Sequence, residues 1–380
     1  MCDILKHTTM KTGDKTMKKI HRTLSLFTVT AMCAALLCSC GAVPDSSQTD
    51  SSSKAATTTT ADTTADTTTA GEASSTASAP DSSVSDSSSA VTDDTKTNGI
   101  TPAMWKVTSP EGNTMVMLGS FHALKDECYP LPEAVTNAYN NADILAVECD
   151  ITSTSEDGEY MKNLMKQMLY NDNTKLSQHI SEEAYSALQT YLGYWGMDIS
   201  ALEVYRPWAV SSTLDTLLIQ DSGFDSEKGL DNYLLTTAHA DGKEIYEVES
   251  VDFQMNLLIN FSDDIYDLMF RSYKGETKES QKQALEDLYT AWKSGDIETF
   301  LEEDNEEELA GYTEEDKKIA EDYNNQMLYD RNKNMAKAAE DLMSQGKNVF
   351  YVVGAAHYAG EGGIIDLLEK DGYTAERVQY

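Results

Sequence analysis

The chain is short of basic residues, and this shortage limits the partners that it can bind. Its 380 residues include 29 Lys and Arg against 64 Asp and Glu, for a formal charge of −35. Phosphate backbones and anionic headgroups attract basic surfaces, so a surface this acidic would repel both. We therefore expect no nucleic-acid partner, and any attachment to a membrane must be covalent or hydrophobic.

Cysteine is also scarce in the part of the chain that can fold. Four of the six cysteines lie in the first 40 residues, which leaves Cys128 and Cys149. At 380 residues the chain is too long to be a disulfide-stapled miniprotein. The two cysteines of an exported chain could pair, but we expect two partly buried thiols that are not joined in a disulfide.

The N-terminal segment has no apolar run long enough to span a bilayer. Basic residues from Lys18 to Arg22 precede a mostly apolar run at 24–37, which is typical of a secretory signal sequence. The run ends in Leu-Cys-Ser-Cys-Gly, with Cys40 as its second cysteine, and this resembles the bacterial lipobox. We favour lipidation of Cys40 over an ordinary cleaved signal with an incidental cysteine, so residues 1–40 are a lipoprotein signal peptide.

Residues 41–99 are expected to form a disordered tether. The segment 41–100 contains 28 Ser and Thr, nine acidic residues and no aromatic side chain. Such a composition cannot bury enough apolar surface to offset the entropy of ordering. The folded domain is therefore expected at 100–380, anchored to the outer face of the cell membrane through the lipid.

The rest of the chain mixes strand and helix patterns, which predicts an α/β domain with a central β-sheet. A hairpin is expected from residues 104–107 and 115–118, and further apolar runs of strand length occur at 144–147, 245–248 and 349–353. Amphipathic helical patterns occupy 181–194, 279–292 and 313–344. The helix-rich middle, 152–294, predicts a cap or insertion.

Two of these strand runs are followed by the same motif, GxxH. Gly119 and His122 follow the run at 115–118, and Gly354 and His357 follow the run at 349–353. Glycine lets the backbone turn sharply and approach a ligand without an intervening side chain. One GxxH is a weak signal, but two copies at strand ends predict a shared site.

Two other strand runs end in carboxylates, Glu148 and Glu249. Ligands of open α/β sheets bind beyond the carboxyl ends of the strands, so these groups and the two imidazoles could converge there. Neutral imidazoles with one or two carboxylates suit a divalent metal such as Mn, Co, Fe or Zn. Hydrolysis is then the natural reaction class, because a bound metal acidifies water and a carboxylate can accept its proton.

The motifs at both ends of the folded part resemble those of the TraB/PrgY/GumN family. Its opening motif is similar to LGSFHALKDECYPLPEAVTNAYNNADILAVECD at 118–150, and its closing motif is similar to FYVVGAAHYAGEGGIIDLLEKDGYTAERV at 350–378. Between them, the family's order is followed by Arg206-Pro207-Trp208, Gly229-Leu230-Asp231, Glu247 to Ser250 with Gln254, and Arg331-Asn332. The family resembles more distantly the Tiki metalloproteases and the erythromycin esterase and ChaN group, whose α/β core this chain is expected to share.

Carried over residue by residue, the resemblance implies the roles of five side chains. His122 and His357 would be the catalytic or metal-binding pair, with Glu148 as the essential carboxylate and a further ligand of Mn, Co or Zn. Glu249 and Arg331 would support the site. Arg331 could instead bind a substrate carboxylate or pair with an acid on its own helix, and the segment 296–316 has no role in the family pattern.

Three functions are compatible with these residues. The first is a lipid-anchored, metal-dependent hydrolase that resembles a peptidase and acts on a peptide or small molecule. The second is a surface protein that sequesters a peptide pheromone or haem without turnover. The third, an inert scaffold, gives no reason for the paired GxxH motifs. The sequence leaves the oligomeric state open.

The predicted anchor can be tested by replacing one atom. In Cys40→Ser the sulfur that would be diacylated is lost, so lipid labelling should disappear and the protein should leave the membrane fraction. Metabolic labelling with a fatty acid and fractionation of native-host cells measure both effects. Wild-type protein that is soluble and unlabelled would contradict the lipoprotein hypothesis.

Overall fold

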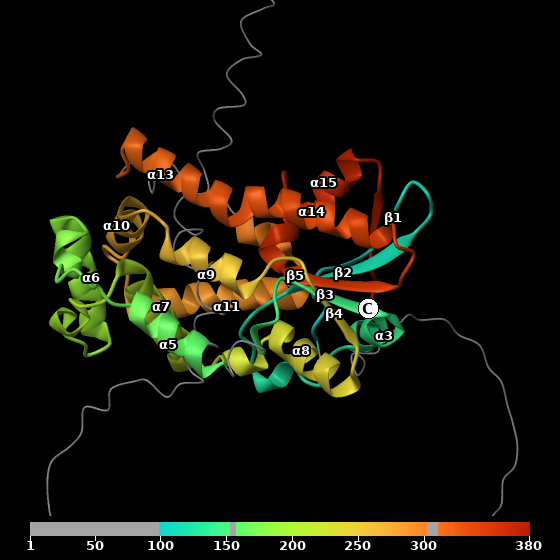
Figure 1. Cartoon of the computed structure of the whole chain (residues 1–380), viewed down its shortest axis with the longest axis horizontal. Helices are drawn as coiled ribbons and strands as arrows, with labels where there is room; N and C mark the ends of the chain where they lie inside the picture. The colour runs from blue at the N-terminus through green and yellow to red at the C-terminus, as the bar shows by residue number, and fades with distance from the viewer. Residues whose placement is uncertain (1–98, 153–156, 302–310) are drawn as a thin grey trace, which may run out of the picture. The chain divides into compact units, whose positions relative to one another are not determined.

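The computed structural model describes residues 99–152, 157–301 and 311–380 (Figure 1). The predicted signal peptide 1–40, nearly all of the predicted tether 41–99, and the centre of the acidic segment 296–316 lie outside the described residues.

A mixed β-sheet forms the centre of the described part of the chain and confirms the α/β class. Its six strands have the order β4-β3-β5-β2-β1-β6. They are β1 (Met104–Thr108), β2 (Thr114–Ser120), β3 (Ile144–Val147), β4 (Glu244–Glu247), β5 (Val349–Gly354) and β6 (Thr374–Arg377). Strands β4, β3, β5 and β2 are parallel, whereas β1 is antiparallel to both β2 and β6. The predicted hairpin is β1–β2, and the sequence analysis missed only β6.

Helices surround this sheet and form a lobe beside it. The α-helices are α3 (Glu133–Asn141), α5 (Gly158–Gln167), α6 (Glu182–Tyr194), α7 (Pro207–Asp221), α8 (Leu230–Asp241), α9 (Val251–Ile259), α10 (Asp263–Ser272), α11 (Lys278–Ser294), α13 (Glu314–Asn324), α14 (Asp330–Met343) and α15 (Ile364–Lys370). Shorter turns are η1 (Asp126–Cys128), η2 (Leu176–Gln178), η3 (Ile199–Leu202), η4 (Ser226–Lys228), η5 (Ile297–Leu301), the π-helix η6 (Asn325–Tyr329) and η7 (Ala355–Tyr358).

The helix starts follow from local capping. Ser181 caps α6 by accepting from the Ala184 N–H, and Thr313 and Asp316 form a capping box at the start of α13. The predicted helix at 313–344 is divided by η6, where five residues are wound more loosely as a π-helix. Such segments are frequent at functional sites, and this one ends two residues before Arg331.

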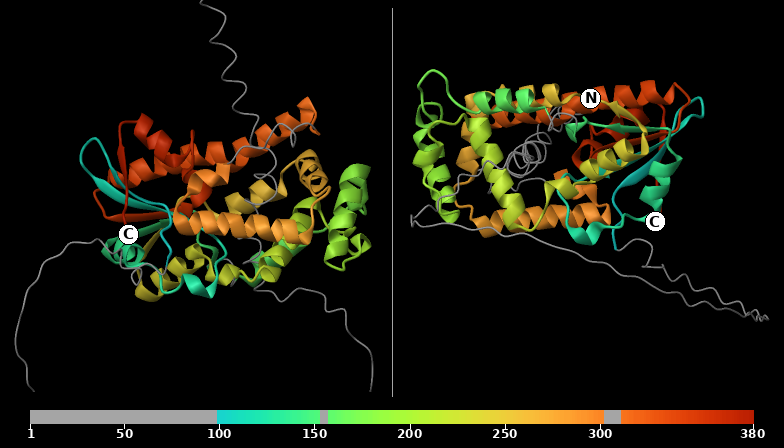
Figure 2. Two further views of the ribbon diagram at one scale, coloured as in Figure 1. Left: turned by 180° about the vertical axis from the view of Figure 1, so that it is seen from behind. Right: turned by 60° about the horizontal axis from the view of Figure 1, so that its bottom comes forward.

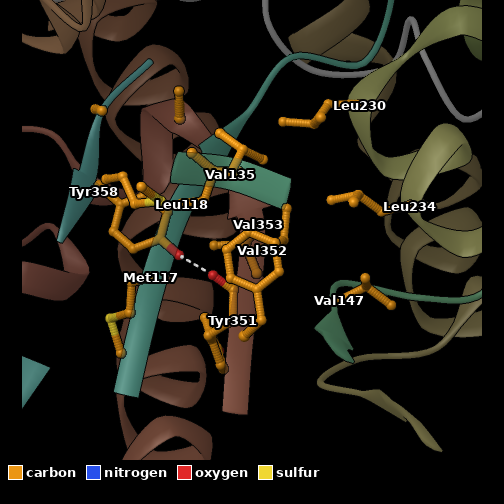
Figure 3. Close-up of a cluster of buried hydrophobic side chains, with 14 of the residues drawn as sticks. Met117, Leu118, Val135, Val147, Leu230, Leu234, Tyr351, Val352, Val353 and Tyr358 are labelled. Carbon is orange, nitrogen blue, oxygen red and sulfur yellow. Dashed lines mark hydrogen bonds between the residues drawn. The ribbon is translucent and has the colours of Figure 1, made fainter. Parts of the chain in front are cut away.

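Both faces of the sheet are covered, which explains why its central strands are apolar throughout. Helices α14 and α15 lie on one face, and α3 and α8 lie on the other (Figures 1 and 2). All residues of β3 and β5 are buried, as expected for parallel strands between helical layers. Figure 3 shows part of this core, including Val147 from β3, Val352 from β5, and Leu230 and Leu234 from α8.

The predicted helical middle packs around a second apolar core. Helices α5, α6, α7, α9 and α10 contribute most of it, and α13 adds Ala320 and Tyr323. Trp208 follows Pro207 at the start of α7 and is 1% exposed, so it belongs to this core. Helices α6 and α10 lie at the end of this lobe far from the sheet (Figures 1 and 2). Among the described helices, none is long and apolar enough to cross a membrane.

Close packing at the first GxxH motif predicts that Gly119 cannot be enlarged. A Cβ on Gly119 would lie 3.0 Å from the Ala355 Cα, which belongs to the second motif. Gly119→Ala should therefore lower the free energy of unfolding by about 1–3 kcal/mol. Gly193→Ala is the matched control, because no atom lies within 4 Å of the new Cβ on α6 and the change should be neutral or stabilising. Urea unfolding measures both, and equal effects would contradict the packing argument.

Candidate functional site

The predicted site residues lie close together, just beyond the carboxyl ends of neighbouring strands. Gly354 pairs with Ser120 at the ends of the parallel strands β5 and β2, and β3 lies on the other side of β5. His122, Glu148 and His357 follow these three strands within a few residues. The site therefore arises from the parallel register, which aligns the carboxyl ends of neighbouring strands.

His122 is held by a carboxylate from α8. Its Nδ1 lies 2.7 Å from Asp231 Oδ2, and 39% of its side chain remains accessible. A carboxylate only accepts, so Nδ1 carries the proton and Nε2 faces the strand ends. Burial lowers the pKa of His122, but the charge and hydrogen bond of Asp231 outweigh it and raise the pKa to about 9.

His357 is held by an amide instead. Its Nδ1 lies 2.6 Å from Asn332 Oδ1, and its Nε2 lies 3.8 Å from Glu148 Oε1. Burial, and then the nearby Arg331 guanidinium, lower the pKa of His357 to about 3. This imidazole is therefore neutral over the whole physiological range of pH.

Glu148 is fixed through both of its oxygens. Oε1 accepts from the Gly354 N–H at 2.7 Å, and Oε2 accepts from Arg331 at 2.7 Å and Gln254 at 2.9 Å. Burial would raise the pKa of this carboxyl, but Arg331 and the two histidines lower it well below its usual range. Glu148 therefore stays ionised at any working pH.

Arg331 links the carboxylates that follow β3 and β4. Its guanidinium donates to Glu249 from Nε at 2.9 Å and from Nη2 at 2.8 Å, and Nη2 also donates to Glu148. Gln254 repeats this bridge, because its Nε2 donates to Glu148 and Glu249, while its Oε1 accepts from the Cys149 thiol. Arg331 thus pairs with acids from other elements, and not with an acid on its own helix.

Gly354 leaves a small space among these groups. A Cβ at Gly354 would lie 3.1 Å from Glu148 Oε1, 3.3 Å from His122 Nε2 and 3.6 Å from His357 Cδ2. The side chains of Glu148, His122 and His357 therefore surround the space beside the Gly354 Cα. A side chain at position 354 would fill this space, so only glycine leaves it open.

The side chains around this space, two imidazoles and a carboxylate, are of the types that bind divalent metals. Each imidazole has its Nδ1 anchored by an outer partner, the arrangement that orients metal-binding histidines. Within the described ranges, no group of three or more His, Cys, Asp or Glu side chains is arranged so that it could hold a metal ion as it stands. Glu148 accepts hydrogen bonds from three protein groups, the Gly354 N–H, Arg331 and Gln254.

The charges around the site favour a cation. Glu148, Glu249, Asp231 and Arg331 have side chains that are between 5% and 14% accessible. Three carboxylates against one guanidinium give these four side chains a formal charge of −2. A buried charge without compensation costs several kcal/mol per ion, so a divalent cation or a protonated His122 would stabilise the cluster.

An apolar cavity opens beside these groups. Its volume is about 150 Å³, and it extends from the strand ends to the helical lobe. His122, Glu148 and His357 line one end, and aliphatic side chains line the rest, including Leu218, Ile219, Leu257, Leu258, Leu285 and Leu288. Such a mixture of a few convergent polar groups and an apolar wall is typical of ligand sites.

Three residues that hold the site together had no role predicted from the sequence: Asp231, Asn332 and Gln254. All three belong to motifs that the sequence shares with the family, so their order along the chain was the available signal. The structure also shows Cys128 and Cys149 buried and not joined in a disulfide, which confirms the prediction.

Comparison with known proteins places the chain among relatives of low identity. The TraB/PrgY/gumN family model matches residues 103–377. The uncharacterized protein YbaP of Escherichia coli K12 is 26% identical over 41% of this chain and 56% of its own length. The metalloprotease TIKI homolog of Nematostella vectensis is 25% identical over 66% of this chain and 61% of its own length.

A vertebrate relative shows a similar partial match. Metalloprotease TIKI1 of Xenopus tropicalis is 23% identical over 64% of this chain and 55% of its own length. The chain thus spans little more than half the length of the curated relatives that it matches. No solved structure gives a significant match.

The pairing of His122 with Asp231 predicts a pH-dependent contribution to stability. Because the pKa of His122 rises from 6.5 to about 9 on folding, the contribution is complete below pH 6.5 and is lost as the pH rises through about 9. Asp231→Asn removes the charge, so the pKa of His122 should fall toward 6.5 or below and this pH dependence should weaken. NMR titration and urea unfolding between pH 6 and about 10 measure both.

A second histidine pair provides the control for this prediction. His179 Nδ1 lies 2.8 Å from Asp263 Oδ2 in the helical lobe, so Asp263→Asn removes a similar charge elsewhere. It should leave the pKa of His122 unchanged. If Asp231→Asn also leaves that pKa at its wild-type value, the electrostatic account of His122 is wrong.

Proposed function

The chain belongs to the TraB/PrgY/gumN family, and from this membership and the geometry of the site we propose that it is a metal-dependent hydrolase of peptide bonds. The observation that carries the proposal is the convergence of His122 Nε2, Glu148 Oε1 and the His357 ring around the space beside Gly354. The names of the relatives, metalloprotease TIKI homolog and TIKI1, support a peptidase over an esterase.

His122 Nε2, His357 Nε2 and Glu148 Oε1 are the atoms that would hold the metal. When bound, a divalent ion such as Mn, Co or Zn supplies Lewis acidity for a carbonyl and for water. Asp231 keeps a proton of His122 on Nδ1, so that Nε2 can present its lone pair to the metal. Because His122 otherwise binds a proton up to about pH 9, metal binding should release that proton and weaken at lower pH.

The neighbouring side chains would keep Glu148 ionised and fix its orientation during the reaction. Among the described residues, Glu148 Oε1 accepts only from the Gly354 N–H, so it retains one lone pair with which it would hold the metal. Arg331 and Gln254 fix its second oxygen and keep the carboxylate ionised. Glu249 balances the Arg331 charge.

The cavity indicates which kind of substrate side chain would bind next to the site. Its aliphatic wall begins at the site and continues toward α7, α9 and α11. Burial of an apolar side chain there would contribute about 25 cal/mol per Å² of apolar surface. We therefore expect cleavage next to a large apolar residue.

The same proposal includes a location. The signal-like run at 24–37 and the cysteine at 40 support lipidation and export, and the acidic tether would extend the domain away from the membrane surface. Peptides outside the cytoplasmic membrane are then the substrates within reach.

Glu148→Gln is the most direct test of the active site. The change preserves the shape of the side chain but removes its charge, so turnover of an apolar peptide by Zn- or Mn-loaded protein should fall at least about 100-fold. Glu247→Gln is the matched control, because Glu247 is exposed at the end of the neighbouring strand β4 and should retain turnover. A quenched-fluorescence peptide library and a thermal melt of each variant provide the measurements.

Two results would overturn the proposal. One is wild-type protein that cleaves no peptide with any of the three metals but binds a peptide or haem tightly, which would establish sequestration. The other is full activity in both His122→Ala and His357→Ala.

A further inference from the structure

We propose that Asn332 is a positioning residue that fixes the tautomer of His357, an inference that rests on the proposed role of His357 as a ligand. Asn332 is 2% exposed and lies next to Arg331 on α14. Its amide contacts two groups: Oδ1 lies 2.6 Å from His357 Nδ1, and Nδ2 lies 2.9 Å from the Gly362 carbonyl oxygen. Asn332 does not itself line the cavity, so it acts through His357, which does.

The orientation of the amide follows from the Gly362 carbonyl. A carbonyl oxygen has no hydrogen to donate, so the group facing it must be the amide NH₂ of Asn332. The amide oxygen then necessarily faces His357, and Nδ1 must be the protonated nitrogen. The neutral ring is left with its lone pair on Nε2, which points to the Glu148 side of the site.

The Gly362 carbonyl is itself held in a defined place. Gly362 has φ +81°, and a Cβ there would lie 3.0 Å from the Tyr329 ring. Its N–H donates to Asp366 Oδ2 at 2.7 Å, and this carboxylate also binds Lys370 on α15. The loop that contains Gly362 therefore connects α15 to the His357 ring through the side-chain amide of Asn332.

The two histidines are consequently fixed by different chemistry. Asp231 fixes the His122 tautomer with a carboxylate, whereas Asn332 fixes the His357 tautomer without adding a charge. Consecutive residues of α14 thus serve two site groups, since Arg331 holds Glu148 and Asn332 holds His357.

Two substitutions in the full chain separate the contacts of Asn332. Asn332→Asp keeps an acceptor for His357 Nδ1 but loses the donor to Gly362, while Asn332→Leu loses both. The tautomer of His357 is read from ring ¹⁵N chemical shifts in metal-free protein. We expect the Nδ1–H form in wild type and a shift toward Nε2–H in Asn332→Leu. In Asn332→Asp the proton should stay on Nδ1, and the added carboxylate should favour the doubly protonated ring.

The functional readout should follow the tautomer. Asn332→Leu should weaken Zn binding and lower kcat by about 10–100-fold, and Asn332→Asp should recover part of this loss. Asn324→Leu is the matched control for losing a buried amide, because Asn324 is 7% exposed and its Oδ1 has no hydrogen-bond partner within the described residues. It should leave the tautomer and Zn binding unchanged.

The outcomes distinguish this inference from the proposed function. A wild-type ring in the Nε2–H form, or an unchanged tautomer in Asn332→Leu, would overturn the positioning role whether or not the protein is a hydrolase. A wild-type ring in the Nδ1–H form that shifts in Asn332→Leu, together with no peptide turnover, would support the positioning role and refute only the hydrolase.

Discussion

The buried guanidinium of Arg331 is the interaction on which the rest of the site depends. It connects α14 to the residues after β3 and β4 through two carboxylates that are 11% and 5% accessible. Removing one partner of such a group leaves an uncompensated buried charge, which costs about 3–5 kcal/mol. The ionised state of Glu148, the place of Glu249 and the approach of α14 to the sheet therefore follow from one side chain.

The imidazoles differ although they occupy equivalent GxxH motifs. His122 is partly accessible and lies beside a carboxylate, so it holds a proton up to about pH 9. His357 is enclosed beside an amide and a guanidinium, so it remains neutral. Gly354 leaves the space where the two rings and Glu148 converge. A proton on His122 would offset part of the excess negative charge of this cluster in the metal-free chain.

The sequence predicted the strands and their end residues well because burial in a parallel sheet leaves a clear signal. The run at 144–147 is all apolar and is β3, and the parallel register then dictates that Glu148 lies near His122 and His357. The partners of these residues were harder to predict. Asp231 and His122 are 109 residues apart, and Glu148 and Arg331 are 183 apart, so no local pattern relates them. The sequence allowed Arg331 a partner on its own helix, and only the packing of α14 shows where it points.

X-ray absorption at the zinc edge of the Zn-loaded full chain tests the central claim most directly, because it reports the ligands themselves. The account predicts one ion per chain, with two imidazole nitrogens at about 2.0–2.1 Å and oxygen ligands in the remaining positions. In His357→Ala one imidazole contribution should disappear from the spectrum. A chain that binds no stoichiometric ion, or an ion whose spectrum contains no imidazole contribution, would contradict it.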